Sequence, residues 1–219
     1  MNTFTIKNRF GLRHTISRVL HTYADLRIGA TEAEKHCHKS SDSILLTFDD
    51  YGTKQEVTGI LAILKAKGVK AMFFLQGDWA AEHPELVAAI AAHGHVLGNH
   101  TTTHQVLKGQ QEATITAEIT GGLPGPWLRP PEGRYDSRVR AIADKLGYYI
   151  CYWTIDSRDW TDVSVAHMRH TILSELHPGA VVLFHVYGMH TRKLLPGLID
   201  SIREHGYQLT DQHEIWMAR

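Results

Sequence analysis

The stretch that decides the fold is LLTFDDYGT, residues 45–53. The apolar run that contains it begins at Ile44 and ends at two adjacent carboxylates, Asp49 and Asp50. A short apolar run of this kind predicts a buried strand. Two neighbouring carboxylates repel each other, and burying an unpaired charge is costly. A cation is therefore expected beside them, and a metal ion is the simplest candidate.

The composition is that of an ordinary globular protein with balanced charge. The chain has 219 residues, 43% of them hydrophobic, and a formal net charge of zero, which is enough for one domain with a substantial core. No basic excess exists to neutralise phosphates, so nucleic acid is not expected as a partner. No segment reaches the ~20 apolar residues of a membrane span. The oligomeric state stays open.

Residues 1–42 are interpreted as an N-terminal arm that precedes a domain at 43–219. A stripe of apolar side chains in the arm predicts a helix over 10–23. The first 20 residues contain no apolar h-region and hence no signal peptide. The expectation is a protein that stays in the cytoplasm, or one whose export signal is not part of this sequence.

The two cysteines give little guidance on redox chemistry. Cys37 lies between two histidines, and these three residues could bind a metal. Because the chain contains 16 histidines, a surface loop is the favoured interpretation. Cys151 lies in an apolar run and is predicted to be a buried core thiol. Whether the two form a bridge stays open.

From residue 43 onward, short apolar runs alternate with amphipathic stretches. Strands are predicted at 44–48, 69–75, 95–97, 127–129, 148–155, 180–184 and 207–209. Helices are predicted at 53–68, 84–94, 111–119, 136–147, 163–176 and 195–205. Thr53 and Asp136 are suited to capping two of these helices, and Pro196 to the first turn of the last one. The helix-to-strand junctions carry the glycines at 68, 94, 147, 179 and 206, where a left-handed residue is wanted.

This alternation predicts an α/β fold in which helices cover a parallel sheet. A full eight-unit barrel usually needs ~250 residues. Because the chain is shorter and offers about seven strands, a distorted or incomplete (β/α) barrel is predicted. An open doubly wound sheet is the alternative.

Polar clusters follow five of the predicted strands, where the active sites of both topologies gather. The first is the Asp49–Asp50 pair. The second contains His100 and His104, which would share one face of a helical turn. Two histidines, one carboxylate and an open position for water make a catalytic zinc-type site. In a chain with 16 histidines the spacing alone is weak evidence, and the nearby acid pair strengthens it.

The other three clusters offer charge partners and an aromatic wall. Arg129 begins RPPEG and can pair with a carboxylate, although it could equally lie on a rigid surface loop. Asp159 and Trp160 end DSRDW, which reads either as an acid beside a sugar-stacking wall or as a helix-capping turn. His185 ends an apolar strand. A lone histidine there is usually a core residue, and its place at the strand end favours a catalytic role.

In this order, the five clusters resemble the motif set of the polysaccharide deacetylase family, also called the NodB homology domain or carbohydrate esterase family 4. The resemblance runs from Ser43 to about Leu209 and makes 43–219 the catalytic domain. It implies a distorted (β/α) barrel and metal-dependent removal of acetyl groups, mostly from N-acetylglucosamine polymers. An N-acetylated glycan such as peptidoglycan, chitin or a chitooligosaccharide is the implied partner.

The resemblance also implies a role for each matched residue. One divalent ion is implied, with its ligands Asp50, His100 and His104. The catalytic residues would be the base Asp49, the acid His185, Arg129 to orient the base and Asp159 to tune the acid. The substrate would contact Trp160 in the groove wall and Leu183 in the pocket for the acetyl methyl group. Zinc suits the ligand set, and cobalt, nickel, iron or manganese could take the same place.

Two positions depart from the family pattern. Tyr51 stands where a glycine usually follows the acid pair, and Glu132 stands where an aromatic residue is common. Both are expected to contact the substrate. Tyr51 is expected to reshape the loop near the metal without removing a ligand, and Glu132 to alter substrate choice. The family uses the backbone N–H near position 132 in an oxyanion hole, which a glutamate leaves intact. The alternatives are an O-acetyl esterase or small-amide deacylase, a carbohydrate-binding protein without activity, and a structural metal site in an unrelated α/β domain.

Overall fold

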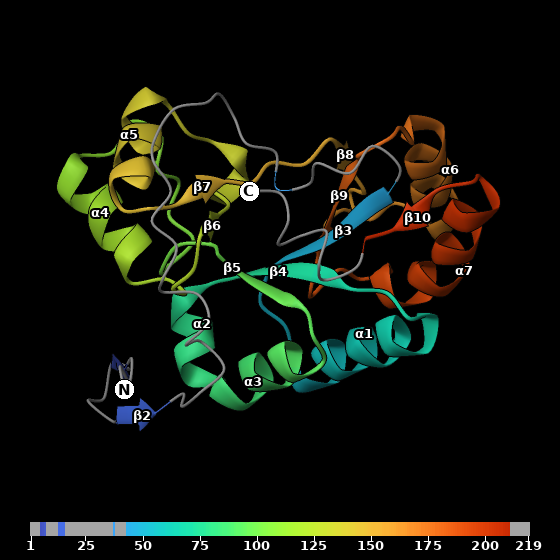
Figure 1. Cartoon of the computed structure of the whole chain (residues 1–219), viewed down its shortest axis with the longest axis horizontal. Helices are drawn as coiled ribbons and strands as arrows, with labels where there is room; N and C mark the ends of the chain where they lie inside the picture. The colour runs from blue at the N-terminus through green and yellow to red at the C-terminus, as the bar shows by residue number, and fades with distance from the viewer. Residues whose placement is uncertain (1–4, 8–12, 16–36, 38–42, 211–219) are drawn as a thin grey trace. The chain divides into compact units, whose positions relative to one another are not determined.

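The computed structural model describes residues 5–7, 13–15, 37 and 43–210 (Figure 1). These residues fall into two compact units. Of the described residues, the first unit contains 5–7, 13–15, Phe74–Ala92 and Leu97–Cys151, and the second contains 37, 43–73, His93–Val96 and 152–210. No helix in the described part of the chain is long and apolar enough to cross a membrane.

One hydrogen-bonded sheet runs through the order β7-β6-β5-β4-β3-β9-β8, and β10 also pairs with β3. Its strands are β3 (Ser43–Asp50), β4 (Ala71–Leu75), β5 (Val96–Asn99), β6 (Trp127–Leu128), β7 (Tyr149–Ile150), β8 (Ile155–Asp156), β9 (Val181–His185) and β10 (Gln208–Leu209). The pairs β3–β9, β3–β10, β8–β9, β5–β6 and β6–β7 are all parallel. The predicted α/β class with a distorted or incomplete barrel is confirmed.

The single strand predicted over 148–155 is wrong. The structure divides this stretch into β7 and β8. β7 pairs with β6 through Trp127↔Tyr149, whereas β8 pairs with β9 through Ile155↔Val182. Because the two strands have different partners, the chain must leave one ladder before it joins the next. The apolar run gives no sign of this break.

In the second unit, helix α1 (Lys54–Lys67) begins and ends as predicted. Thr53 and Glu56 form a reciprocal capping box, and Gly68 closes the helix with a left-handed φ of 62°. All eight residues of β3 are buried. Phe48 on β3 stacks against Phe184 of β9 with ring centroids 5.6 Å apart. This packing fixes β3 and β9 side by side, and their carboxyl ends carry two of the predicted polar clusters.

The other helices of the second unit are α6 (Val165–Glu175) and α7 (Thr191–Glu204). Helix α7 starts four residues before the predicted position, so Pro196 lies inside the helix and not in its first turn. The Thr191 hydroxyl donates to the Asp159 carboxylate and holds the helix start there. Pro196 removes one backbone donor, but the buried leucine and isoleucine face of α7 keeps the helix intact.

The first unit contains helices α2 (Gly77–Glu82), α3 (Pro84–Ala92), α4 (Glu112–Thr120) and α5 (Ser137–Lys145), with a 3₁₀ turn, η1 (Pro131–Gly133). Helix α2 was not predicted. Asp136 caps α5 as predicted, because its carboxylate accepts from the backbone N–H groups of Arg138 and Val139. The core between α4, α5 and β6 is formed by Leu107, Ile115, Ile119, Leu128, Val139, Ile142 and Ala143.

Two predictions for the N-terminal arm and the cysteines need correction. Arg13–Thr15 form a strand, β2, that pairs antiparallel with β1 (Thr5–Lys7), so the helix predicted at 10–23 is wrong there. The rest of that range lies outside the described residues. A short helix is marginal in water without packing, so local strand pairing can displace it. Cys151 is buried as predicted, but both cysteines are disulfide-bonded, so it is not a free thiol.

Candidate active site and metal centre

Strands β3 and β9 bring an acid pair and a histidine together. In their parallel register Asp49 lies opposite His185, and the Val186 N–H donates to the Asp49 carbonyl at 3.0 Å. Asp49 and Asp50 are only 3% and 4% exposed. The backbone turns at Asp50, whose φ is 74°, and its Oδ2 lies 3.8 Å from His185 Nε2. Two buried carboxylates and one imidazole therefore lie together at the carboxyl ends of β3 and β9.

Asp159 fixes the His185 ring. Its Oδ1 lies 2.8 Å from His185 Nδ1, and its Oδ2 accepts from the His185 backbone N–H at 2.8 Å. An ionised carboxylate can only accept, so Nδ1 carries a proton and Nε2 lies on the side of Asp50. Burial opposes a charged imidazole. The Asp159 hydrogen bond and the charges of Asp159, Asp49 and Asp50 outweigh it and raise the pKa of His185 above its ordinary value.

The close packing around Asp159 requires a glycine at position 188. A Cβ added there would lie 2.2 Å from Asp159 Oδ2 and 2.2 Å from Thr191 Oγ1. Both contacts are far shorter than carbon–oxygen packing allows. The hydrogen bonds between Asp159 and His185 therefore depend on a residue without a side chain at position 188, three residues after His185.

His100 and His104 lie in a loop after β5, and not on the helical turn that their spacing suggested. His100 is 2% exposed, and its Nδ1 lies 2.7 Å from the Arg129 carbonyl oxygen. Because a carbonyl only accepts, Nδ1 must donate, so a metal bond from His100 would use Nε2. Thr101 and His104 have φ values of 65° and 64°. Left-handed backbone at residues other than glycine costs about 1–3 kcal/mol each.

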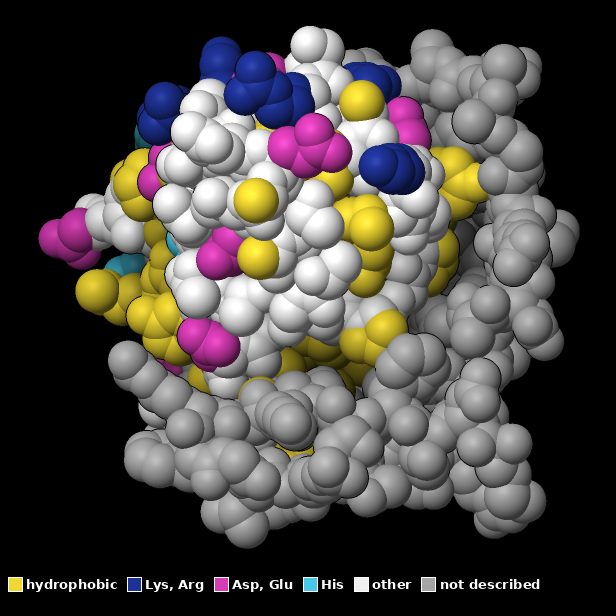
Figure 2. Space-filling model, turned by 90° about the vertical axis from the view of Figure 1, so that its left-hand side faces the viewer, with side chains coloured by type: hydrophobic (Ala, Val, Ile, Leu, Met, Phe, Trp, Pro, Cys, Tyr) yellow, Lys and Arg dark blue, Asp and Glu magenta, His cyan; other side chains and the backbone are white. Residues whose placement is uncertain are grey.

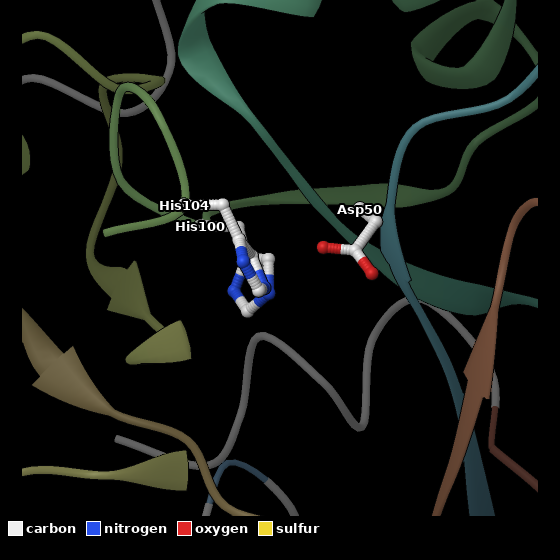
Figure 3. A group of neighbouring side chains, drawn as sticks. All are labelled: Asp50, His100 and His104. Carbon is white, nitrogen blue, oxygen red and sulfur yellow. The ribbon is translucent and has the colours of Figure 1, made fainter. Parts of the chain in front are cut away.

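Asp50, His100 and His104 together form a possible metal centre (Figure 3). Each offers one ligand atom, and these atoms lie within 4.8 Å of one another. The two imidazole rings meet edge to face, with centroids 4.9 Å apart. One carboxylate and two imidazoles are a donor set that zinc accepts, with a position left for water. The fixed Nδ1–H of His100 is the outer hydrogen bond that metal-bound histidines usually make. The residues therefore fit a divalent ion.

Arg129 is entirely buried. Its guanidinium lies over the Phe74 ring at 4.2 Å, and its Nε donates to the Cys151 carbonyl at 3.1 Å. Its own carbonyl binds His100, as described above. Its role in orienting Asp49 stays a prediction.

The residues expected on the substrate side differ in exposure. Trp160 and Tyr51 are 55% and 45% exposed, whereas Leu183 is buried in β9. Glu132 is exposed, has a φ of 55° and pairs with the exposed Arg134 at 3.4 Å. Such a surface pair contributes little stability. Whether these four residues contact a substrate stays a prediction.

The sequence reasoning did not single out Tyr187, which lies two residues after His185. Its ring centroid is 5.3 Å from that of His185 and 5.5 Å from that of Tyr51. Burial, the charges of Asp50 and Asp159, and a hydrogen bond to Asp50 raise the pKa of Tyr187. Tyr187 lies in the turn after β9, so the alternation of side chains along a strand gives no signal for it. Thr191 gave no signal either, because its partner Asp159 is 32 residues away.

Fold and side chains together define an α/β protein with a possible mononuclear metal centre beside a buried histidine–aspartate pair. Comparison with known sequences agrees: residues 37–151 match the profile of polysaccharide deacetylases. The chain belongs to the polysaccharide deacetylase family.

Several relatives have names that state an activity. The chain is 36% identical over 169 residues to a peptidoglycan-N-acetylglucosamine deacetylase of Bacillus cereus, covering 73% of this chain and 60% of that protein. It is 32% identical over 154 residues to a chitooligosaccharide deacetylase of Bradyrhizobium, covering 65% and 70%. A solved structure from Bacillus anthracis, described as a pseudoenzyme of carbohydrate esterase family 4, matches with a TM-score of 0.76 and 28% identity, covering 80% of this chain and 65% of that chain. This chain thus spans only part of each relative.

Proposed function

We propose that this protein is a metal-dependent deacetylase that hydrolyses the acetamido group of N-acetylglucosamine-containing glycans such as peptidoglycan, chitin or chitooligosaccharides. One observation carries the proposal: Asp49, Asp50 and the Asp159-bound His185 meet at the ends of two strands in register. A base and an acid at one site are what amide hydrolysis needs.

The roles follow from the chemistry of each group. A divalent ion bound by Asp50, His100 and His104 would polarise the acetyl carbonyl and lower the pKa of water. Asp49 takes a proton from the attacking water. His185 gives its Nε2 proton to the departing nitrogen, because an amine anion is a poor leaving group.

The remaining residues position these groups. Asp159 keeps His185 in the right tautomer and stabilises its charged form. Arg129 orients Asp49, and a backbone N–H near Glu132 binds the developing oxyanion. Trp160 and Tyr51 line the glycan path, and Leu183 borders the pocket for the acetyl methyl group.

An O-acetyl esterase on the same scaffold is the second candidate. An alcohol leaves more readily than an amine, so an esterase needs a general acid less. The buried Asp159–His185 pair, with the raised pKa of His185, favours the amide as substrate. A small intracellular amide would need the same acid, so a panel of substrates must separate it from glycans.

The proposal is tested by acetate release from chitooligosaccharides and from peptidoglycan. The protein is stripped with a chelator, and Zn²⁺, Co²⁺, Ni²⁺, Mn²⁺ or Fe²⁺ is added back. Activity should vanish on stripping and return with at least one ion. Asp49→Asn and His185→Ala should each lower the rate by about 10²–10⁴, whereas His177→Ala, at an exposed histidine, should leave it unchanged.

Because one structurally similar protein is described as a pseudoenzyme, the test must also recognise a protein that binds glycan without hydrolysing it. If the protein binds glycan but releases no acetate from either substrate or from O-acetylated xylan with any of these ions, it is a carbohydrate-binding protein and the proposal is wrong. Release from O-acetylated xylan alone would instead establish the esterase.

A further inference from the structure

We propose that Glu118 is a positioning residue that holds the loop 100–104 in the conformation needed for metal binding. The inference rests on the metal site of the proposed function, and it assigns a role to a residue that no sequence motif singled out. Glu118 lies on α4, in the same compact unit as the loop.

The Glu118 carboxylate is unusual because it is buried and its hydrogen bonds all go to one short segment. It is 8% exposed. Its Oε2 accepts from the backbone N–H groups of Thr102 and Thr103 at 3.2 Å and 3.0 Å. Its Oε1 accepts from the Thr103 hydroxyl at 2.8 Å. Three donors satisfy the oxygens of a carboxylate that would be costly to bury without partners. The carboxylate therefore fixes two consecutive loop residues.

Helix and loop lie unusually close at this point. The Thr102 hydroxyl donates to the Glu118 carbonyl at 3.0 Å. A Cβ at Gly121 would lie 2.3 Å from Thr102 Oγ1, and one at Gly122 would lie 2.1 Å from Asn99 Oδ1. The two glycines at the end of α4 thus allow the loop to approach the helix.

The other side of the loop rests on α2. The Gly77 N–H donates to the Thr101 carbonyl at 2.8 Å, and the Asp78 N–H donates to the Thr102 carbonyl at 3.0 Å. These bonds involve backbone groups alone. Within the described residues, Glu118 is the side chain that holds the amide groups of both Thr102 and Thr103.

This loop needs to be held because its backbone is strained. Thr101 is β-branched and left-handed, which is a strong outlier for that residue type. Such conformations persist only when their surroundings fix them. His100 has an anchor on the Arg129 carbonyl. His104 comes directly after the two residues that Glu118 holds, so the place of its imidazole depends on this carboxylate.

The test compares three variants of the full chain: Glu118→Ala, Glu118→Gln and Glu112→Ala. Glu112 is an exposed glutamate on the same helix and serves as the matched control. Affinity for Zn²⁺ is measured on the stripped protein by competition with a chromophoric chelator. Loss of an outer residue that orients a metal ligand typically weakens metal binding about 10–100-fold. A loss of this size is expected for Glu118→Ala, because Glu118 positions His104 through Thr102 and Thr103.

Glu118→Gln should recover most of this affinity. Its single carbonyl oxygen can accept from both backbone N–H groups, and its amide can donate to the Thr103 hydroxyl. Glu112→Ala should bind Zn²⁺ as the wild type does. Zn²⁺ affinity of Glu118→Ala within twofold of wild type would overturn the proposal, and so would equal losses in all three variants.

A second measurement separates this proposal from that of the function. Amide hydrogen exchange of the stripped wild type should show Thr102 and Thr103 protected as strongly as the buried turns of α4. Rapid exchange there would overturn the role of Glu118 even if the enzyme is active. Strong protection in a protein that binds no Zn²⁺ would overturn the proposed metal site and leave Glu118 as the residue that orders the loop. If Glu118→Ala does not fold, the hydrogen exchange of the wild type and the Zn²⁺ affinity of Glu118→Gln still test the proposal.

Discussion

His95 makes folding stability depend on pH, and the size of the effect can be worked out. The imidazole is 3% exposed, just before β5. Its Nδ1 accepts a hydrogen bond from the Ala71 N–H at 3.2 Å. A proton on Nδ1 would point at this N–H and break the hydrogen bond. Burial, and then the nearby charges of Lys70 and His93, lower the pKa of His95 from 6.5 to about 3. Folding therefore keeps this side chain neutral.

The sign follows from proton counting. Above pH 6.5 His95 is mostly neutral in both the folded and the unfolded state, so it does not change the free energy of unfolding. Below pH 6.5 the unfolded chain binds a proton that the folded protein does not. The free energy of unfolding therefore decreases as the pH is lowered from 6.5 to about 3. Between pH 7 and pH 5 the loss is about 2 kcal/mol. Because pH 5 lies well above the folded pKa, this figure depends mainly on the unfolded value.

The assay is urea unfolding at pH 7 and at pH 5 for the wild type and His95→Asn. The asparagine oxygen can accept from the Ala71 N–H but does not titrate in this range. The difference in unfolding free energy between the two proteins should change by about 2 kcal/mol between the two pH values. His177→Asn, at an exposed site, should show no such change. A parallel pH response of wild type and His95→Asn would refute the reasoning.

Three further predictions concern the acid, its tether and a helix cap. His185→Ala should slow acetate release from chitooligosaccharides by about 10²–10⁴. It should slow the hydrolysis of 4-nitrophenyl acetate far less, because nitrophenolate leaves without a proton. Equal losses with both substrates would contradict the role of His185 as the acid. Gly188→Ala should displace Asp159 and cost about 1–3 kcal/mol in urea unfolding, whereas Gly197→Ala, near a flexible arginine tip, should be neutral or stabilising. Thr53→Ala should cost about 1 kcal/mol and lower the melting temperature by about 2–4 °C; an unchanged melting temperature would mean that the capping box contributes nothing.

The parts of the fold that the sequence predicted are those set by local chemistry. Thr53 caps α1 because its hydroxyl and Glu56, three residues away, satisfy each other's backbone groups. The glycines at 68, 94, 147, 179 and 206 all adopt positive φ, as expected at helix ends. Both signals act over a few residues, so they can be read directly from the chain.

The parts that could not be predicted depend on contacts between distant residues. The true start of α7 is set by Thr191 on Asp159, and the place of Glu118 by Thr103, 15 residues earlier. The division of 148–155 into two strands depends on which strand each half pairs with. Spacing suggested a helical turn at His100 and His104, but the contacts of Thr101 and Thr102 with α2 and α4 override that local preference.

The two parts of the candidate site are built differently, and this has a consequence that can be measured. Asp49 and His185 are fixed by strand register and buried packing, whereas His104 depends on a strained loop and on one carboxylate. Loosening the loop should therefore alter metal affinity without altering the acid. At saturating Zn²⁺, Glu118→Ala should keep the wild-type ratio of amide to ester hydrolysis, while His185→Ala should lower that ratio. A change of the ratio in Glu118→Ala would show that loop and acid move together, contrary to the rigid β3–β9 register.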